Sequence, residues 1–207
     1  MITLSLKLIF KYTLLTLSVI MAIAAFILYW ILQLNNGYRK LPKEKDLLFE
    51  HVKPYNKTEY WAYLTADASG KIIDTIYESG DLPMQLNIKS PHGSLFRTNV
   101  MMPVYKFIVY LDHGNLRYVT DHNDLKNFIG VIDNMQEALI MAYSLGFSYT
   151  DEYGTGYREV NQTYEFVLNR VTTCPYTKET TYLKFDKQGV TKIEKRHTEN
   201  YESCLMF

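Results

Sequence analysis

The first hydrophobic stretch of the chain is longer than a helix of a small globular domain requires. No residue between Lys11 and Arg39 is charged, and residues 12–34 form an almost continuous apolar run of 23 residues. At about 1.5 Å per residue such a helix extends roughly 35 Å, whereas the hydrocarbon core of a bilayer is about 30 Å thick. The pattern predicts an uncleaved transmembrane helix within residues 1–34, of the signal-anchor type, with the lipid bilayer as its partner.

Two other interpretations of this stretch stay open, a cleaved signal peptide and a buried core helix. Residues 22–24, Ala-Ile-Ala, resemble a small-residue cleavage site. The apolar run nevertheless continues well beyond them, and a signal peptide normally ends near its cleavage site. The anchor is therefore the preferred interpretation.

The positive charges around the apolar run do not decide its orientation. Lys7 and Lys11 precede it, and a cluster of lysine and arginine between residues 39 and 45 follows it, so the two flanks are nearly matched. The body of the chain is rich in tyrosine and in strand-like segments, a composition familiar outside the cytoplasm. We therefore expect a single-pass membrane protein whose globular domain is periplasmic or extracellular.

The pattern changes twice after the apolar run. Residues 35–58 are polar and interrupted by glycine and proline, which is typical of a juxtamembrane tether. From residue 59 the chain alternates between hydrophobic and polar positions, as strands do. We interpret residues 59–207 as one globular domain, which could consist of two related halves, 59–120 and 121–207.

The domain is predicted to combine antiparallel strands with one main helix. Asp133 and Gln136 fit a capping box at the start of that helix, and Gly146 fits the residue just beyond its end. A shorter helical turn is expected at 121–130. Strands are expected at 60–64, 71–78, 94–100, 104–111, 116–119, 157–161, 163–171, 180–185 and 190–197.

The expected fold class is therefore α+β: one N-terminal transmembrane helix, followed by a single small domain of antiparallel sheet with one main helix. The order of a helix followed by a meander resembles that of small extracytoplasmic modules of the PepSY kind. The likeness is one of pattern without a shared motif, and a fold analogy carries no function.

Composition and charge exclude several classes of protein. The chain has 22 basic and 22 acidic residues, so its formal net charge is zero and no nucleic-acid partner is indicated. A hydrophobic content of 47% excludes a disordered chain.

The chain contains no motif of a known catalytic or cofactor site. No nucleophile elbow, phosphate-binding loop, dinucleotide fingerprint or zinc-protease motif is present. Two Asp-His pairs, 112–113 and 121–122, are separated by a predicted strand, which would hold their histidines roughly 30 Å apart if extended. We interpret them as a hairpin turn and a helix cap. We expect no catalytic residue, no metal site and no cofactor.

The two cysteines have three possible roles. A bridge between Cys174 and Cys204 would close a loop of about 30 residues and tie down the C-terminus, provided that the domain faces an oxidising compartment. In the cytoplasm both would be free thiols. The last four residues, 204–207, also fit a prenylation signal, which a chain with a membrane helix would hardly need.

The chain has 18 tyrosines, and some of them surround a glycine loop. Tyrosine offers a rigid, amphipathic contact area at low entropic cost, which suits recognition. It also suits half-buried strand faces, so most of the 18 need no functional role. A partner surface is therefore expected around the loop, formed by Tyr149, Tyr153, Gly154, Gly156 and Tyr157.

Taken together, these features predict a non-catalytic, membrane-anchored protein that presents an interaction or binding module to another membrane or envelope protein. Two alternatives remain. The first is an accessory subunit of a membrane complex, because Ser18, Ala22, Ala24 and Ala25 give the helix a small-residue face. The second is a membrane-tethered hydrolase that would bring some of the histidines 92, 113 and 122 into one cleft.

Overall fold

The computed structural model describes most of the chain beyond residue 36 and two short pieces before it. The described ranges are 19–21, 23–25, 37–56, 58–83, 87–91, 93–96, 104–148, 155–173 and 176–200. The chain forms two compact units, residues 1–38 and residues 39–207, and the fold below is that of the second unit.

The prediction of a transmembrane helix at 12–34 is corrected. Residues 19–21 and 23–25 are helical and exposed, and the other residues of that segment lie outside the described part of the chain. Each of these pieces extends about 4.5 Å, against the roughly 30 Å of a bilayer core. Within the described ranges, no helix is long and apolar enough to cross a membrane. The predicted signal-anchor, single-pass topology and extracytoplasmic location, which all depended on that helix, are corrected with it.

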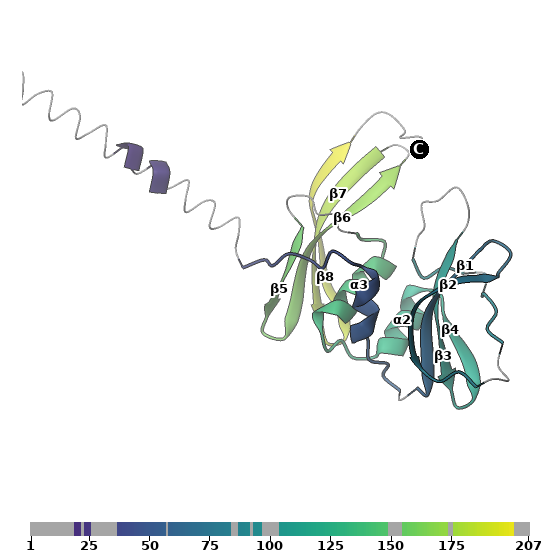
Figure 1. The fold of residues 1–207 in the computed structure, drawn as a ribbon. Helices are drawn as coiled ribbons and strands as arrows, with labels where there is room; N and C mark the ends of the chain where they lie inside the picture. The colour runs from purple at the N-terminus through teal and green to yellow at the C-terminus, as the bar shows by residue number, and fades with distance from the viewer. Residues whose placement is uncertain are drawn as a thin grey trace, which may run out of the picture. The chain divides into compact units, whose positions relative to one another are not determined.

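The first half of the second unit forms a four-stranded antiparallel sheet, called sheet 1 (Figure 1). Its strands are β1 (Tyr60–Ala66), β2 (Ile72–Gly80), β3 (Tyr105–Asp112) and β4 (Asn115–Val119), in the spatial order β2-β1-β3-β4. The predicted hairpin turn at 112–115 joins β3 to β4, with both His113 and Gly114 at positive φ. This is the geometry of a two-residue hairpin loop.

The second half forms another four-stranded antiparallel sheet, called sheet 2. It is a meander in sequence order, β5-β6-β7-β8, as the pattern of the sequence predicts for this part of the chain. Its strands are β5 (Gly156–Val160), β6 (Thr163–Thr173), β7 (Tyr176–Asp186) and β8 (Gly189–Asn200). A tight turn at 187–188 joins the two longest neighbours, β7 and β8.

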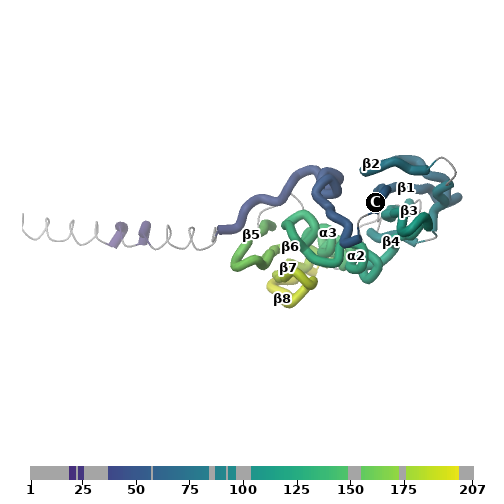
Figure 2. The backbone as a smooth tube through the Cα atoms, turned by 90° about the horizontal axis from the view of Figure 1, so that it is seen from below, coloured from purple at the N-terminus to yellow at the C-terminus, as the bar shows by residue number. Residues whose placement is uncertain are grey.

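Three short helices lie between the two sheets, as Figures 1 and 2 both show. They are the 3-10 helix η1 (Asp46–His51), α2 (His122–Ile129) and α3 (Met135–Ser144). Their buried residues form one hydrophobic core with residues of both sheets, such as Trp61 and Phe166. A second, smaller cluster lies on the other face of sheet 1 and includes Phe107 and Val109.

The predicted fold class is therefore wrong in two respects beyond the membrane helix. The described chain is mostly antiparallel strand, in two four-stranded sheets rather than one. It also lacks a dominant helix, because α2 has 8 residues and α3 has 10. The predicted strand at 94–100 does not form over Ser94–Phe96, and residues 97–100 lie outside the described ranges.

The two ends of α3 lie at or next to the residues that the sequence predicts. The N-cap is Asn134, one residue later than predicted, and its side-chain oxygen accepts a hydrogen bond from the Glu137 N–H. At the other end Gly146 has φ +84°, and the N–H groups of Gly146 and Phe147 donate to the carbonyls of Tyr143 and Ala142. This paired arrangement is a Schellman motif, so the predicted role of Gly146 is confirmed.

The segment predicted as a polar tether contributes to the core of the second unit. Leu41, Leu48, Phe49 and Val52 are all buried and belong to the main hydrophobic cluster. The Phe49 ring stacks on Tyr63 of β1, with centroids 3.9 Å apart. The proposed division of residues 59–207 into two halves stays a prediction.

Candidate functional site

The candidate site lies on the face of sheet 2 that the hydrophobic core does not use. Side chains of a strand alternate between its two faces. On β6, Phe166 and Leu168 belong to the core, so Glu165 and Asn169 project from the opposite face. The core pattern of β7 likewise places Tyr182 and Lys184 on that face, beside β6. Among the described residues, all three helices contribute to the core side.

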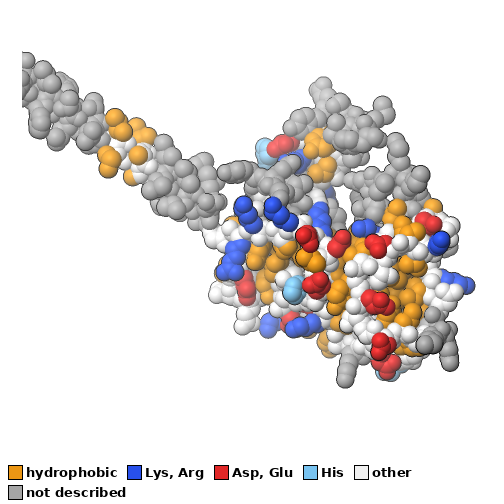
Figure 3. Space-filling model, viewed as in Figure 1, with side chains coloured by type: hydrophobic (Ala, Val, Ile, Leu, Met, Phe, Trp, Pro, Cys, Tyr) orange, Lys and Arg blue, Asp and Glu red, His pale blue; other side chains and the backbone are white. Residues whose placement is uncertain are grey.

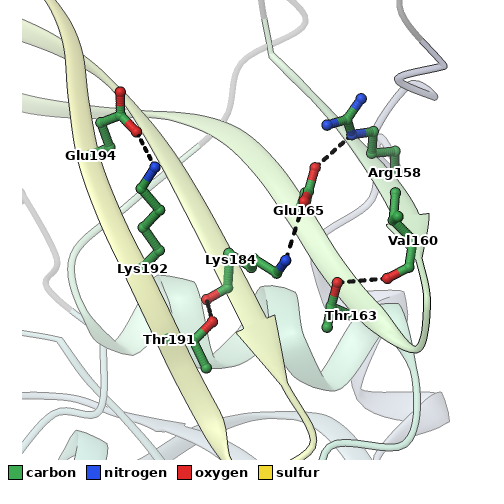
Figure 4. Close-up of polar contacts among 8 residues, drawn as sticks. All are labelled: Arg158, Val160, Thr163, Glu165, Lys184, Thr191, Lys192 and Glu194. Carbon is green, nitrogen blue, oxygen red and sulfur yellow. Dashed lines mark hydrogen bonds and ion pairs between the residues drawn. The ribbon is translucent and has the colours of Figure 1, made fainter.

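A row of three charged residues crosses the strands on this face. The Arg158 Nε donates to Glu165 Oε2 at 2.6 Å, and the Lys184 Nζ lies 3.7 Å from Glu165 Oε1. Figure 4 shows Glu165 of β6 between its two partners, which come from β5 and β7. The row therefore ties three neighbouring strands together through side chains as well as through the backbone.

Glu165 is an ionised group that its neighbours hold almost out of solvent. Only 6% of its surface is exposed. Burial alone would raise the pKa of this carboxyl, but hydrogen bonds from Arg158 and Tyr182 and the positive charges of Arg158 and Lys184 outweigh it. The net result is a lowered pKa. Glu165 is thus fixed as a carboxylate at neutral pH.

Tyr182 forms the centre of a second group on the same face. The guanidinium carbon of Arg196 lies 4.8 Å from the centroid of the Tyr182 ring, and the Lys192 Nζ lies 5.6 Å from it. Both positions are favourable for a cation over an aromatic face. Lys192 also pairs with Glu194 at 2.6 Å, and that pairing lowers the pKa of Glu194. The ring is therefore covered by cations and is only 8% exposed.

We call this set of residues the charged face. It contains four cations and two carboxylates around one tyrosine ring: Arg158, Lys184, Lys192 and Arg196, with Glu165 and Glu194, around Tyr182. Four positive charges against two negative ones give this set a net positive charge, and both carboxylates are paired with cations of the same set. Figure 3 shows one view of the surface, in which basic, acidic and hydrophobic side chains lie side by side.

Replacing Glu165 with glutamine is expected to lower the free energy of unfolding by about 1–2 kcal/mol at neutral pH, because two cations lose their negatively charged partner and one of its two acceptor oxygens. Since the folded-state pKa of Glu165 lies below its ordinary value of 4.5, the contribution is complete above that value. It is lost as the pH falls through the folded-state pKa. Urea unfolding of both proteins across this range measures it, with Glu159→Gln as an exposed control. If the difference in free energy of unfolding between the unaltered protein and Glu165→Gln grew as the pH fell, the lowered pKa of Glu165 would be wrong.

The residues of the predicted tyrosine-glycine surface are only partly described. Tyr149, Tyr153 and Gly154 lie outside the described ranges. Gly156 begins β5 and is buried, and the Tyr157 ring packs beside Phe166 on the core side, with centroids 6.4 Å apart. Arg158 of the charged face is the next residue along the chain. The predicted surface stays a prediction, and the charged face adjoins it.

The other candidate residues are only partly described. Cys174 and Cys204 lie outside the described ranges, as does His92, so the disulfide stays a prediction. His113 is in the loop before β4 and His122 begins the helix after it, at opposite ends of the strand. The interpretation of Asp121 as a helix cap is confirmed, because its carboxylate accepts the Asp124 N–H.

His122 has one contact that the sequence did not suggest. Its Nδ1 lies 2.7 Å from the Ser144 Oγ, and that hydroxyl also donates to the Met141 carbonyl at 2.8 Å. Burial and the charge of Lys126 lower the pKa of His122. Because the hydroxyl is already bound to a backbone carbonyl, the pair links α2 to α3 and is poorly suited to nucleophilic attack.

The described residues offer little else that could hold a ligand. An open groove of about 320 Å³ lies beside η1, and Leu47, Leu48, His51 and Gln136 are among the residues that line it. No group of three or more histidine, cysteine or acidic side chains in the described ranges is arranged to hold a metal ion. Comparison of the chain with protein families, with curated proteins and with solved structures finds no match.

The sequence carries a signal for the charged face. Positions 192, 194 and 196 are charged at alternating positions of one predicted strand, and Lys184 lies on the neighbouring one. Alternation of this kind marks the outward face of a strand. The sequence does not indicate that Lys192 and Arg196 lie over the ring of Tyr182.

Proposed function

We propose that the second unit is a non-catalytic interaction module that binds an acidic segment of a partner protein through the charged face. The observation that carries the proposal is the almost buried Glu165–Tyr182 pair, surrounded by four cations on a sheet face outside the core. Tyrosine and arginine are the residue types that most often dominate binding energy at protein interfaces.

The restricted freedom of the charged face supports this proposal. Long cationic side chains on a solvated surface normally move freely, and binding must overcome the entropy lost when they become ordered. Here Arg158 is bound to Glu165, and Arg196 and Lys192 lie over the Tyr182 ring. Much of the ordering is therefore already present in the unbound protein.

The charge of the face supports an acidic partner. Four cations outnumber two carboxylates, and each carboxylate is paired with a cation of the same face. A partner that presents aspartate or glutamate side chains would meet a complementary potential, which speeds association and selects against basic partners.

The hydrolase alternative finds no support in the described residues, because His113 and His122 lie at opposite ends of β4 and the Ser144 hydroxyl is bound to the backbone. A second alternative is that the charged face is an ordinary solvated sheet surface that binds no partner. A binding experiment distinguishes this alternative from the proposed interaction surface.

The experiment compares the binding of a polyglutamate peptide to three full-length proteins by calorimetry at low salt. We expect Lys192→Glu combined with Arg196→Glu to weaken binding at least tenfold, because two attractive charges become repulsive. The matched control combines Lys71→Glu with Lys89→Glu, two exposed residues outside sheet 2 whose exchange alters the net charge by the same amount.

Equal weakening by the two double variants would mean that the peptide responds only to overall charge, and the proposal would fail. It would also fail if the unaltered protein did not bind the peptide at all. Retained binding by the control and loss by the charged-face variant is the supporting result. Amide chemical shifts that change on β6–β8 would map the contact to this face.

A further inference from the structure

Sheet 2 has one edge that is paired and one that is open. The N–H and C=O of Tyr157 on β5 are both bonded to the backbone of Arg39, at 3.0 and 2.6 Å. At the other edge β8 pairs with β7, and the described chain contains no further strand beside it. Figure 2 shows β8 in yellow at this margin of the sheet. An open edge strand presents unpaired backbone groups to which another strand can bind.

The open edge includes a regular stretch directly beside the charged face. The register of β7 and β8 shifts at two places, between Thr180 and Thr181 and between Lys184 and Phe185. Between these shifts the residues 192–195 of β8 follow β7 without irregularity. This stretch is long enough to guide the backbone of a short added strand.

The side chains of this stretch alternate in character. Lys192 and Glu194 point to the charged face, where Arg196 also lies over Tyr182. Ile193 is in register with Leu183 and so points to the other face, yet 54% of its surface is exposed. A strand added here would place its alternate residues beside Lys192, Glu194 and Arg196 on one face and beside the exposed Ile193 on the other.

The charges of β8 also select which strand can be added. Lys192 and Arg196 carry positive charge on one face of this edge, and Glu194 lies between them. This pattern favours a strand that has acidic residues facing Lys192 and Arg196 and a polar or basic residue facing Glu194. The exposed Ile193 favours an apolar residue between them.

We propose that the acidic partner segment binds as an added β-strand alongside residues 192–195 of β8. Its acidic residues would lie beside Lys192 and Arg196, a polar or basic residue beside Glu194, and an apolar residue beside Ile193. This inference rests on the proposed function and extends it from an acidic segment of any shape to an extended one whose two acidic residues are four positions apart.

The test uses two short peptides that are blocked at both ends. Each has two glutamates four positions apart, a glutamine midway between them to face Glu194, and valine at the positions between. One has an ordinary backbone, and in the other every backbone nitrogen is methylated. Both have the same charges, but only the first can donate backbone hydrogen bonds to β8. We expect the ordinary peptide to bind the full-length protein at least tenfold more tightly, because several backbone hydrogen bonds are lost in the other. It should also slow amide exchange within residues 192–195.

The outcomes separate this inference from the function on which it rests. Equal binding of the two peptides, with unchanged exchange on β8, would overturn strand addition and leave recognition of acidic segments intact. If neither these peptides nor polyglutamate bound, both proposals would fail. Tighter binding of the ordinary peptide that Lys192→Glu with Arg196→Glu abolishes would support both.

Discussion

Replacing Gly80 with alanine is expected to lower the free energy of unfolding by roughly 3 kcal/mol or more, the largest effect of any single methyl group that we anticipate. Gly80 ends β2 at φ +83°. A Cβ there would lie 2.0 Å from the carbonyl oxygen of Glu59 and 3.2 Å from the Tyr60 Cα. Both are backbone atoms, so neither can rotate away. The start of β1 would have to separate from the end of β2.

Gly114 provides the matched control for this prediction. Its φ of +79° is nearly the same, but a Cβ would meet nothing within 4 Å. Gly114→Ala therefore has the conformational strain of a positive φ without a clash between the new Cβ and the backbone. We expect it to lower the free energy of unfolding by about 1–2 kcal/mol. Urea unfolding of the two variants separates the two contributions. Equal losses would mean that β1 and β2 adjust easily, and that the close contact at Gly80 has little importance.

Features that depend on a few neighbouring residues were predictable from the sequence. The hairpin turn at 112–115, the cap at Asp121 and the end of α3 at Gly146 are each defined by the conformational preferences of single residues. The meander of sheet 2 was predictable for the same reason, because successive strands joined by short turns pair with their neighbours.

The presence of two sheets could not be predicted in this way. In sheet 1 the central strand β1 pairs with β3, some 40 positions further along the chain, as well as with β2. A pairing over that distance leaves no local pattern. One signal was nevertheless present: residues 60–66, YWAYLTA, have no charged side chain and no alternating polar positions, which is typical of a strand covered on both faces. All seven of these residues are buried.

The charged face required knowledge of which side of sheet 2 is covered. Glu165 lies between Tyr164 and Phe166 and looks misplaced in an apolar run. Only the packing of α3 and β6 into one core shows that this position faces outward, next to Arg158 and Lys184. Sequence patterns reveal that faces alternate, but not which of two faces meets the helices.

Glu137 is the charged residue whose loss should matter most to the core. It is fully buried at the start of α3. Its Oε1 accepts the Lys53 N–H at 2.9 Å and its Oε2 accepts the Asp133 N–H at 2.8 Å. One side chain therefore joins α3 to the segment that follows η1, beside the hydrogen bond from the Asn134 side chain to the His51 carbonyl.

We expect Glu137→Gln to destabilise the domain by roughly 1–3 kcal/mol, although it removes a buried charge. An amide can accept only one of the two N–H groups, and its own NH₂ would face the other. Glu137→Ala leaves both donors unpaired and should cost more. The exposed Glu50→Gln, measured by urea unfolding in parallel, is expected to cost almost nothing.

The pH dependence of these variants tests which influence dominates at Glu137. Burial and the nearby Asp133 raise the pKa of its carboxyl, and the hydrogen bonds from the backbone oppose that rise. A raised folded-state pKa means that the folded protein holds this proton more tightly than the unfolded chain does. The stability contributed by Glu137 is then greatest below its ordinary pKa and falls as the pH rises through the folded-state value. The difference in free energy of unfolding between the unaltered protein and Glu137→Gln should therefore become smaller from acidic to neutral pH. If this difference became larger instead, the two N–H donors would outweigh burial, and the fold would prefer the carboxylate form of Glu137.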